Sequence, residues 1–210
     1  LHCLNDFFVV DSSQKFNLKC RSKVKYMKKA FLFPGQGSQF IGMGKELADQ
    51  FDAARDVFSE VDDALGEPLS NLIFKGDIEE LTLTKNAQPA IMAVSIAIIR
   101  VMLSKGLDIK AINLFAGHSL GEYSALCASG VISLWDTAII LRERGLAMQK
   151  AVPEGDGSMI AVIGMNSEFV NELITLSKCD RELIQVANDN DPSQVVVSGE
   201  KKEVQKFSAF

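Results

Sequence analysis

The segment that most constrains this chain is Gly117-His118-Ser119-Leu120-Gly121, which directly follows the apolar run 111–116. A serine bracketed by glycines where a strand gives way to a helix is typical of a nucleophile elbow, a sharp turn that lifts the hydroxyl above the sheet edge. Side chains at 117 and 121 would collide with the crossing strand and helix, which is why glycine stands there. The pattern predicts that Ser119 attacks a carbonyl carbon, with the amide N–H of Leu120 as one oxyanion donor.

The alternative is a glycine-rich turn that holds a serine by chance, since five-residue patterns of this kind recur. The segment 122–128 favours the elbow, because its small residues allow a helix to press closely on a sheet. His118 precedes the serine on the entering strand, where side-chain alternation points it away from the Ser119 hydroxyl. We therefore expect His118, with Gly117 and Gly121, to support the elbow rather than to act as its base.

Composition restricts the class of protein. The chain has 210 residues, 47% of them hydrophobic, so it can bury a sizeable core and form one domain with a smaller second one. A net charge of −5 argues against a nucleic-acid partner. The four cysteines form no C-x-x-C pair, so we expect no disulfide framework, no metal site and a reducing compartment. The apolar stretch 89–99 is short for a bilayer span and is closed by Arg100, which predicts a buried helix and no membrane partner.

Residues 1–26 differ in texture from the rest of the chain. They begin at Leu1, carry a basic cluster, show no clear period, and end just before Met27, which resembles a natural start. We expect this extension to be disordered and to lie outside the fold. Upstream read-through or added sequence is the favoured interpretation, and an organellar transit peptide is the alternative.

From Lys29 onward the pattern predicts an α/β chain. We expect a capping box at Ser133 to open a helix. The expected strands are 30–33 and 111–116, and the expected helices start near 41, span 52–65 and 88–105, and start at 134. A proline- and glycine-containing linker at 152–157 is followed by strand 159–163, helix 167–177, strands 183–187 and 194–197, and a helix from 200.

The order of elements after the linker, β-α-β-β-α, matches five of the six elements of a ferredoxin-like unit. We therefore predict a large α/β-hydrolase-like domain with a parallel sheet at 27–151 and a small ferredoxin-like subdomain at 152–210. Both are expected to be incomplete.

Five motifs occur in order between about Met27 and Phe207, at spacings that make the set far more specific than any member. They are Phe33-Pro34-Gly35-Gln36-Gly37-Ser38-Gln39, Gln88-Pro89-Ala90, Gly117-His118-Ser119-Leu120-Gly121-Glu122-Tyr123, Arg142-Glu143-Arg144-Gly145 and Met148-Gln149. Together they resemble the malonyl-CoA:acyl carrier protein transacylases of type II fatty-acid synthesis.

The resemblance implies a role for each matching position. Ser119 would accept the malonyl group as an oxygen ester, and the backbone N–H of Gln36 would pair with that of Leu120 as the second oxyanion donor. Arg144 would hold the free carboxylate of malonate, and Gln88 would line the active site. A guanidinium suits this task because it grips a carboxylate with two charge-assisted hydrogen bonds. From the residues alone, the favoured interpretation is that Arg142 and Arg144 are ordinary solvated helix residues that pair with Glu143 or other neighbours.

One departure affects the expected activity. The family places a catalytic histidine beyond the small subdomain, and this sequence ends before any matching residue. We expect an incomplete member whose transfer activity is weak or absent. The alternatives are a serine esterase sharing the elbow and an inactive, truncated transacylase that only binds acyl carrier protein.

The same resemblance sets the expected partners. The substrates are malonyl-CoA and phosphopantetheinylated acyl carrier protein, and no metal or redox cofactor is expected. We also expect a monomer in a bacterial-type cytoplasm, with organellar import through residues 1–26 as the alternative.

Overall fold

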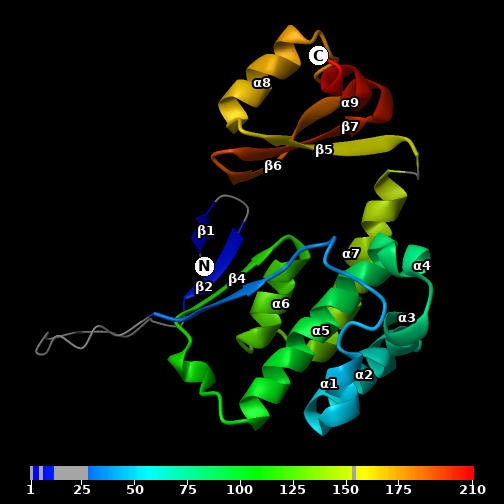
Figure 1. Cartoon of the computed structure of the whole chain (residues 1–210), viewed down its shortest axis with the longest axis vertical. Coiled ribbons are helices and arrows are strands. Elements are labelled where there is room, and N and C mark those ends of the chain that lie inside the picture. Colours follow the sequence, from blue (N-terminus) through cyan, green and yellow to red (C-terminus); the bar gives the residue numbers. More distant parts are fainter. Residues whose placement is uncertain (1, 5–6, 12–27, 153–154) are drawn as a thin grey trace, which may run out of the picture. The chain divides into compact units, whose positions relative to one another are not determined.

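The structure, a computed structural model, describes residues 2–4, 7–11, 28–152 and 155–210 (Figure 1). The chain divides into two compact units, residues 1–147 and 148–210. The division falls inside helix α7 (Leu134–Ala151), whose last four residues belong to the second unit. It therefore lies slightly before the boundary of 151/152 expected from the linker.

The first unit is built on a mixed sheet in the order β1-β2-β4-β3. β3 (Ala30–Phe33) runs parallel to β4 (Leu114–His118), with Phe33 opposite Gly117. β4 also pairs antiparallel with β2 (Phe7–Asp11), which pairs with β1 (His2–Leu4). The expectation of a disordered extension does not hold for these two strands, because β2 gains backbone hydrogen bonds from the edge of β4 and β1 gains them from β2. The other residues of 1–26 lie outside the described part of the chain.

The strand before the elbow differs from its predicted position. A short 3-10 helix, η1 (Ile109–Ala111), occupies the start of the range 111–116, and the strand begins only at Leu114. The carboxylate of Asp108 accepts a hydrogen bond from the Lys110 N–H at 3.0 Å and so caps η1. The carboxamide of Asn113 is also engaged, since it accepts from the Lys29 N–H at 3.0 Å. Because residues 108–113 are engaged in these bonds, the strand begins later than predicted, at Leu114.

The helices of the first unit largely follow the predicted pattern. Gly42 and Gly44 have φ of 90° and 73°, which delays the helix expected from 41 until Lys45. The hydroxyl of Ser133 accepts from the Asp136 N–H at 3.0 Å, so the predicted capping box is present. The bounds are α1 (Lys45–Gln50), α2 (Asp52–Leu65), α3 (Leu69–Lys75), α4 (Ile78–Thr82), α5 (Thr84–Ser104) and α6 (Leu120–Ala128).

Helix α5 forms the centre of the first unit's core. It begins at Thr84, earlier than predicted, and its 21 residues make it long and apolar enough to cross a membrane by length and composition. The expectation that this stretch is too short was therefore wrong, because the helix also includes the polar residues before Pro89. Its buried face packs against α2 and α6, and 67% of its most apolar window is buried inside the protein. A buried core helix, as predicted, accounts for its composition.

The second unit has the predicted β-α-β-β-α order, with antiparallel strands in the order β5-β7-β6 (Figure 1). Its elements are β5 (Gly157–Ile163), α8 (Ser167–Leu176), β6 (Ile184–Asp191), β7 (Gln194–Glu200) and α9 (Lys201–Ser208). Apolar side chains of both helices and the sheet form one core, with Val170, Val197 and Phe207 among its buried members. Its assignment as a ferredoxin-like unit stays a prediction.

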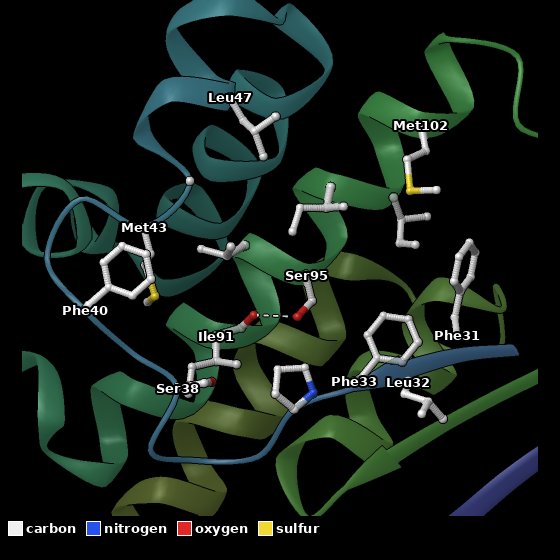
Figure 2. Close-up of a pocket in the computed structure, with 15 residues that line it drawn as sticks. Phe31, Leu32, Phe33, Ser38, Phe40, Met43, Leu47, Ile91, Ser95 and Met102 are labelled. Carbon is white, nitrogen blue, oxygen red and sulfur yellow. Dashed lines mark hydrogen bonds between the residues drawn. The ribbon is translucent and has the colours of Figure 1, made fainter.

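An apolar groove of about 510 Å³ lies beside β3 and is bounded by α1 and α5 (Figure 2). Phe33, Met43 and Ile91 line it, and Leu32 on its border is 76% exposed. In the described part of the chain, β3 is hydrogen-bonded to a strand on one side only. The groove contains none of the predicted site residues, so the chemistry has to be sought at the opposite edge of β3, where it meets β4.

Candidate active site

Ser119 occupies a sharp turn between the end of β4 and the start of α6. Its φ of 55° and ψ of −112° are values that side-chain-bearing residues rarely adopt. Strain of this kind costs about 1–3 kcal/mol and tends to be retained at functional positions. The backbone geometry is that of the predicted nucleophile elbow.

The two flanking glycines allow this turn to form. A Cβ on Gly117 would overlap the backbone of Gly121, and a Cβ on Gly121 would overlap the carbonyl oxygen of Phe33 at the end of β3. The helix therefore starts in direct backbone contact with both strands. This confirms the steric reason given for glycine at these two positions.

The hydroxyl of Ser119 does not cap the helix that it precedes. A serine at this position ordinarily accepts a hydrogen bond from an amide of the first helical turn, and no such bond forms here. Instead, Ser119 Oγ accepts a hydrogen bond from Arg144 Nη2 at 3.0 Å. A turn that held a serine for local structural reasons would not require this partner.

Arg144 comes from α7 and is fixed by three groups. Its Nη1 donates to Gln88 Oε1 at 2.7 Å, and its guanidinium carbon lies 5.7 Å from the centre of the Tyr123 ring. Gln88 is fully buried on α5, and Tyr123 lies one helical turn after Ser119 on α6. The structure thus brings together Ser119, Arg144 and Gln88, and the interpretation of Arg144 as a solvated helix residue is wrong.

The glycine-rich loop after β3 approaches the elbow from the other strand. A Cβ on Gly35 would lie 2.8 Å from His118 Nδ1, so the loop is packed against the residue before the serine. The side chain of Gln36 donates weakly to Thr84 Oγ1, at 3.4 Å, at the start of α5. These contacts hold the Gln36 backbone near the elbow. Its role as an oxyanion donor stays a prediction.

Positive charge and oriented dipoles meet at the Ser119 hydroxyl. Leu120 is buried and begins α6, so its amide is among the N–H groups that have no acceptor within the helix. The positive end of the helix dipole and the Arg144 cation both favour a negatively charged oxygen at this position. The arrangement can therefore stabilise an anion formed when Ser119 attacks a carbonyl group.

Cys127 is a second potential nucleophile on α6, and its surroundings make it inert. Burial raises the pKa of its thiol, and this effect outweighs the hydrogen bond with Thr137 and the positive charge of Arg100, which lower it. The thiol therefore stays protonated at neutral pH. Ser119 is the residue on this helix that is equipped for attack.

Two residues around the cluster, Tyr123 and Asn86, could not be given a role from the sequence. Tyr123 was part of a quoted motif without a role, although its position four residues after Ser119 on a helix indicates the same face. Asn86 lies two residues before Gln88, and no sequence pattern indicated a role for it. It accepts a hydrogen bond from Arg142 Nη1 at 2.5 Å, a contact that only the packing of α5 against α7 creates.

A serine at a strained elbow, hydrogen-bonded to a half-buried arginine on an α/β unit, defines the class of serine acyltransferase domains. The family model described as "Acyl transferase domain" matches residues 30–209. This chain belongs to that acyltransferase family, which confirms the resemblance drawn from the five motifs.

Relatives within the family carry a more specific name. The malonyl CoA-acyl carrier protein transacylase of Bacillus subtilis is 50% identical over 181 residues, which cover 86% of this chain and 56% of the relative. The enzyme of the same name from Escherichia coli K12 is 41% identical over 180 residues, covering 86% and 57%. This chain therefore spans just under three fifths of the length of the relatives that it matches.

Solved structures agree with this assignment. The crystal structure of an acyl-carrier-protein-S-malonyltransferase from Bartonella henselae matches with a TM-score of 0.82 and 58% identity, over 87% of this chain and 58% of the other. A malonyl-transacylase in complex with a type II PKS acyl-carrier protein matches with a TM-score of 0.80 and 41% identity, over 87% and 58%. The α/β fold class predicted for the large domain is confirmed.

Proposed function

We propose that this chain carries the nucleophile and the carboxylate-binding residues of a malonyl-CoA:acyl carrier protein transacylase. The observation that supports this most strongly is the 3.0 Å hydrogen bond from Arg144 Nη2 to Ser119 Oγ. It places a permanent cation beside the hydroxyl of Ser119, the residue whose backbone forms the strained elbow. The names of the relatives point to the same reaction.

In the first half of the proposed reaction, Ser119 Oγ attacks the thioester carbon of malonyl-CoA and loses its proton to a base. The amides of Gln36 and Leu120 hold the resulting oxyanion, the C–S bond breaks, and CoA leaves as the protonated thiol. In the second half, the phosphopantetheine thiol of acyl carrier protein attacks the serine ester and regenerates the Ser119 hydroxyl. No oxidation state changes, so neither half requires a redox cofactor, and the two amides supply the charge stabilisation that a metal ion would otherwise provide.

Arg144 gives this proposal its substrate class. Malonyl differs from acetyl by one carboxylate, and a guanidinium held by Gln88 and Tyr123 can accept that carboxylate with two charge-assisted hydrogen bonds. An acetyl group would leave the cation without a charged partner in a half-buried position, which disfavours it. A serine esterase has no use for a cation at this place.

The base is the part of the reaction that these residues do not supply. The chain has two histidines, and neither matches the family's catalytic position. We propose that a histidine at the family's catalytic position acts as base in both halves. Without it, these 210 residues acylate Ser119 slowly, and their onward transfer of malonyl to acyl carrier protein is slow or absent. Acyl carrier protein as partner, a monomeric state and a cytoplasmic location are parts of the same proposal.

Intact-protein mass spectrometry after incubation with malonyl-CoA tests the proposal. We expect a slowly formed adduct of one malonyl group that is absent from Ser119→Ala and reduced in Arg144→Ala. Hydrolysis of p-nitrophenyl esters that survives Arg144→Ala would instead favour the esterase. Binding of acyl carrier protein without any acyl adduct would favour the alternative of a binding-only chain.

A further inference from the structure

Two side-chain hydrogen bonds join α5 to α7 at the same separation in sequence. Arg144 Nη1 donates to Gln88 Oε1 at 2.7 Å, and Arg142 Nη1 donates to Asn86 Oδ1 at 2.5 Å, each across 56 residues. Only the first pair contacts Ser119. The second pair, Arg142 and Asn86, has no role in the reaction proposed above.

The two bonds lie on opposite flanks of the helix contact. Residues two apart on an α-helix point about 200° away from each other. Between the flanks, the backbones meet at Gly145, where an added Cβ would lie 2.6 Å from Lys85 Cα. A rotation of α7 about its own axis would therefore stretch one of the two bonds, so together they fix the direction in which Arg144 points.

Asn86 is held in one orientation. It is 4% exposed, and its Nδ2 donates to the Glu80 carbonyl oxygen at 2.8 Å and to Glu80 Oε1 at 2.9 Å. Its carboxamide oxygen must then face Arg142, because the nitrogen is already engaged. Asn86 thus presents a fixed acceptor to α7.

Arg142 is held on its second side as well. Its Nη2 forms an ion pair with Glu67 Oε1, and its own side chain is only 13% exposed. Lys85 Nζ lies 3.3 Å from Glu80 Oε1. Positive and negative side chains therefore alternate along the network, in the order Lys85, Glu80, Arg142 and Glu67. The network connects α4, α5, α7 and the segment before α3, and it fixes the position of the Arg142 guanidinium.

We propose that Asn86 and Arg142 are positioning residues that hold Arg144 beside Ser119 and thereby set the preference for acyl groups with a free carboxylate. The inference rests on the proposed function for its substrate class. Neither residue contacts Ser119. Each acts by preventing α7 from rolling, which keeps the Arg144 guanidinium on Gln88 and on the serine hydroxyl.

The test compares the initial rates at which malonyl-CoA and acetyl-CoA acylate Ser119, followed by intact mass. Arg142→Gln is expected to lower the malonyl-to-acetyl ratio by about tenfold, the size of one lost hydrogen bond to a charged group. Arg142→Lys keeps the charge without the fork and is expected to retain part of the ratio. Arg55→Gln is the matched control, because Arg55 is exposed and pairs only locally with Asp52, and its ratio should not change.

A double variant separates positioning from a general loss of structure. If Arg142 acts through Arg144, then Arg142→Gln has no further effect on the ratio in a chain that already carries Arg144→Ala. An equal effect in both backgrounds would overturn the proposal. Should Arg142→Gln fail to fold, Glu67→Gln removes the same support from a half-exposed side chain, and the same comparison applies.

A second readout does not depend on acylation. In NMR spectra of the free protein, the heteronuclear NOE of the Arg144 Nε–H should indicate a rigid side chain in the parent and a mobile one in Arg142→Gln. If Arg142→Gln makes the Arg144 side chain mobile but the parent forms no malonyl adduct, the proposed function is contradicted and the positioning role stands. An adduct whose acyl ratio and Arg144 rigidity are both unaffected by Arg142→Gln would overturn the positioning role alone.

Discussion

Arg144 Nη2 lies 3.0 Å from Ser119 Oγ, although Arg144 lies on α7 and Ser119 lies in the turn before α6. The contact places a guanidinium where negative charge would develop during attack on a thioester, and where the carboxylate of a malonyl group would have to bind. Two demands on one side chain explain why Gln88 and Tyr123 hold it from other directions.

Replacing Arg144 is expected to change which acyl group is accepted more than how fast Ser119 reacts. In Arg144→Ala the preference for malonyl-CoA over acetyl-CoA should fall by about a hundredfold, because two charge-assisted hydrogen bonds are lost. Arg144→Lys should lie between the two, since an ammonium supplies charge without the fork. Competition between the two thioesters, followed by mass spectrometry, gives the ratio. The exposed neighbour variant Glu143→Gln is the control and should behave as the parent.

The strain at Ser119 predicts an unusual order of stabilities. Glycine tolerates a φ of 55° and a ψ of −112°, whereas alanine does not. Ser119→Gly should therefore be more stable than Ser119→Ala by about 1 kcal/mol in urea unfolding. Both variants lose the nucleophile, so the comparison isolates the backbone. Equal or greater stability of the alanine variant would show that the elbow is not strained.

The contact between α6 and β3 makes Gly121 intolerant of any side chain. Gly121→Ala would drive a methyl group into the carbonyl oxygen of Phe33, and we expect a loss of more than about 2 kcal/mol in the free energy of unfolding. Gly130→Ala is the matched control. Gly130 has a φ of 80° and open space around it, so only the cost of a side chain in the left-handed region, about 1–2 kcal/mol, applies there. A Gly121 variant no less stable than the Gly130 variant would contradict the close approach.

The exposed edge of β3 predicts that this chain aggregates at high protein concentration. Leu32 is 76% exposed beside an apolar groove, on a strand whose outer edge is unpaired within the described residues. Leu32→Lys should raise the protein concentration at which light scattering begins, because a charge on an edge strand opposes pairing. Its far-UV circular dichroism should match that of the parent. Unchanged scattering would show that this edge does not drive association.

The elbow could be predicted from sequence because its causes are local. Glycines at 117 and 121, a strand before Ser119 and a small-residue helix after it are all encoded within a few positions. The structure contains each of them, with the strand shifted to Leu114–His118. The capping box at Ser133 is equally local, since its two partners are three residues apart.

What could not be predicted depends on contacts between distant segments. The start of α5 at Thr84 follows from the short helix before it and from the packing around Asn86, which no periodicity reveals. The pairing of Arg142 with Asn86 exists only because α5 and α7 cross at Gly145. The motif that contains Arg144 was visible, and the resemblance gave it a role, whereas its spacing alone did not distinguish it from a solvated helix face.

The most direct test is a crystal structure of this protein after soaking with malonyl-CoA. The account predicts continuous density for an ester on Ser119 Oγ, with the malonyl carboxylate within hydrogen-bonding distance of the Arg144 guanidinium. An acyl group attached elsewhere, or a serine ester whose carboxylate points away from Arg144 into solvent, would contradict it.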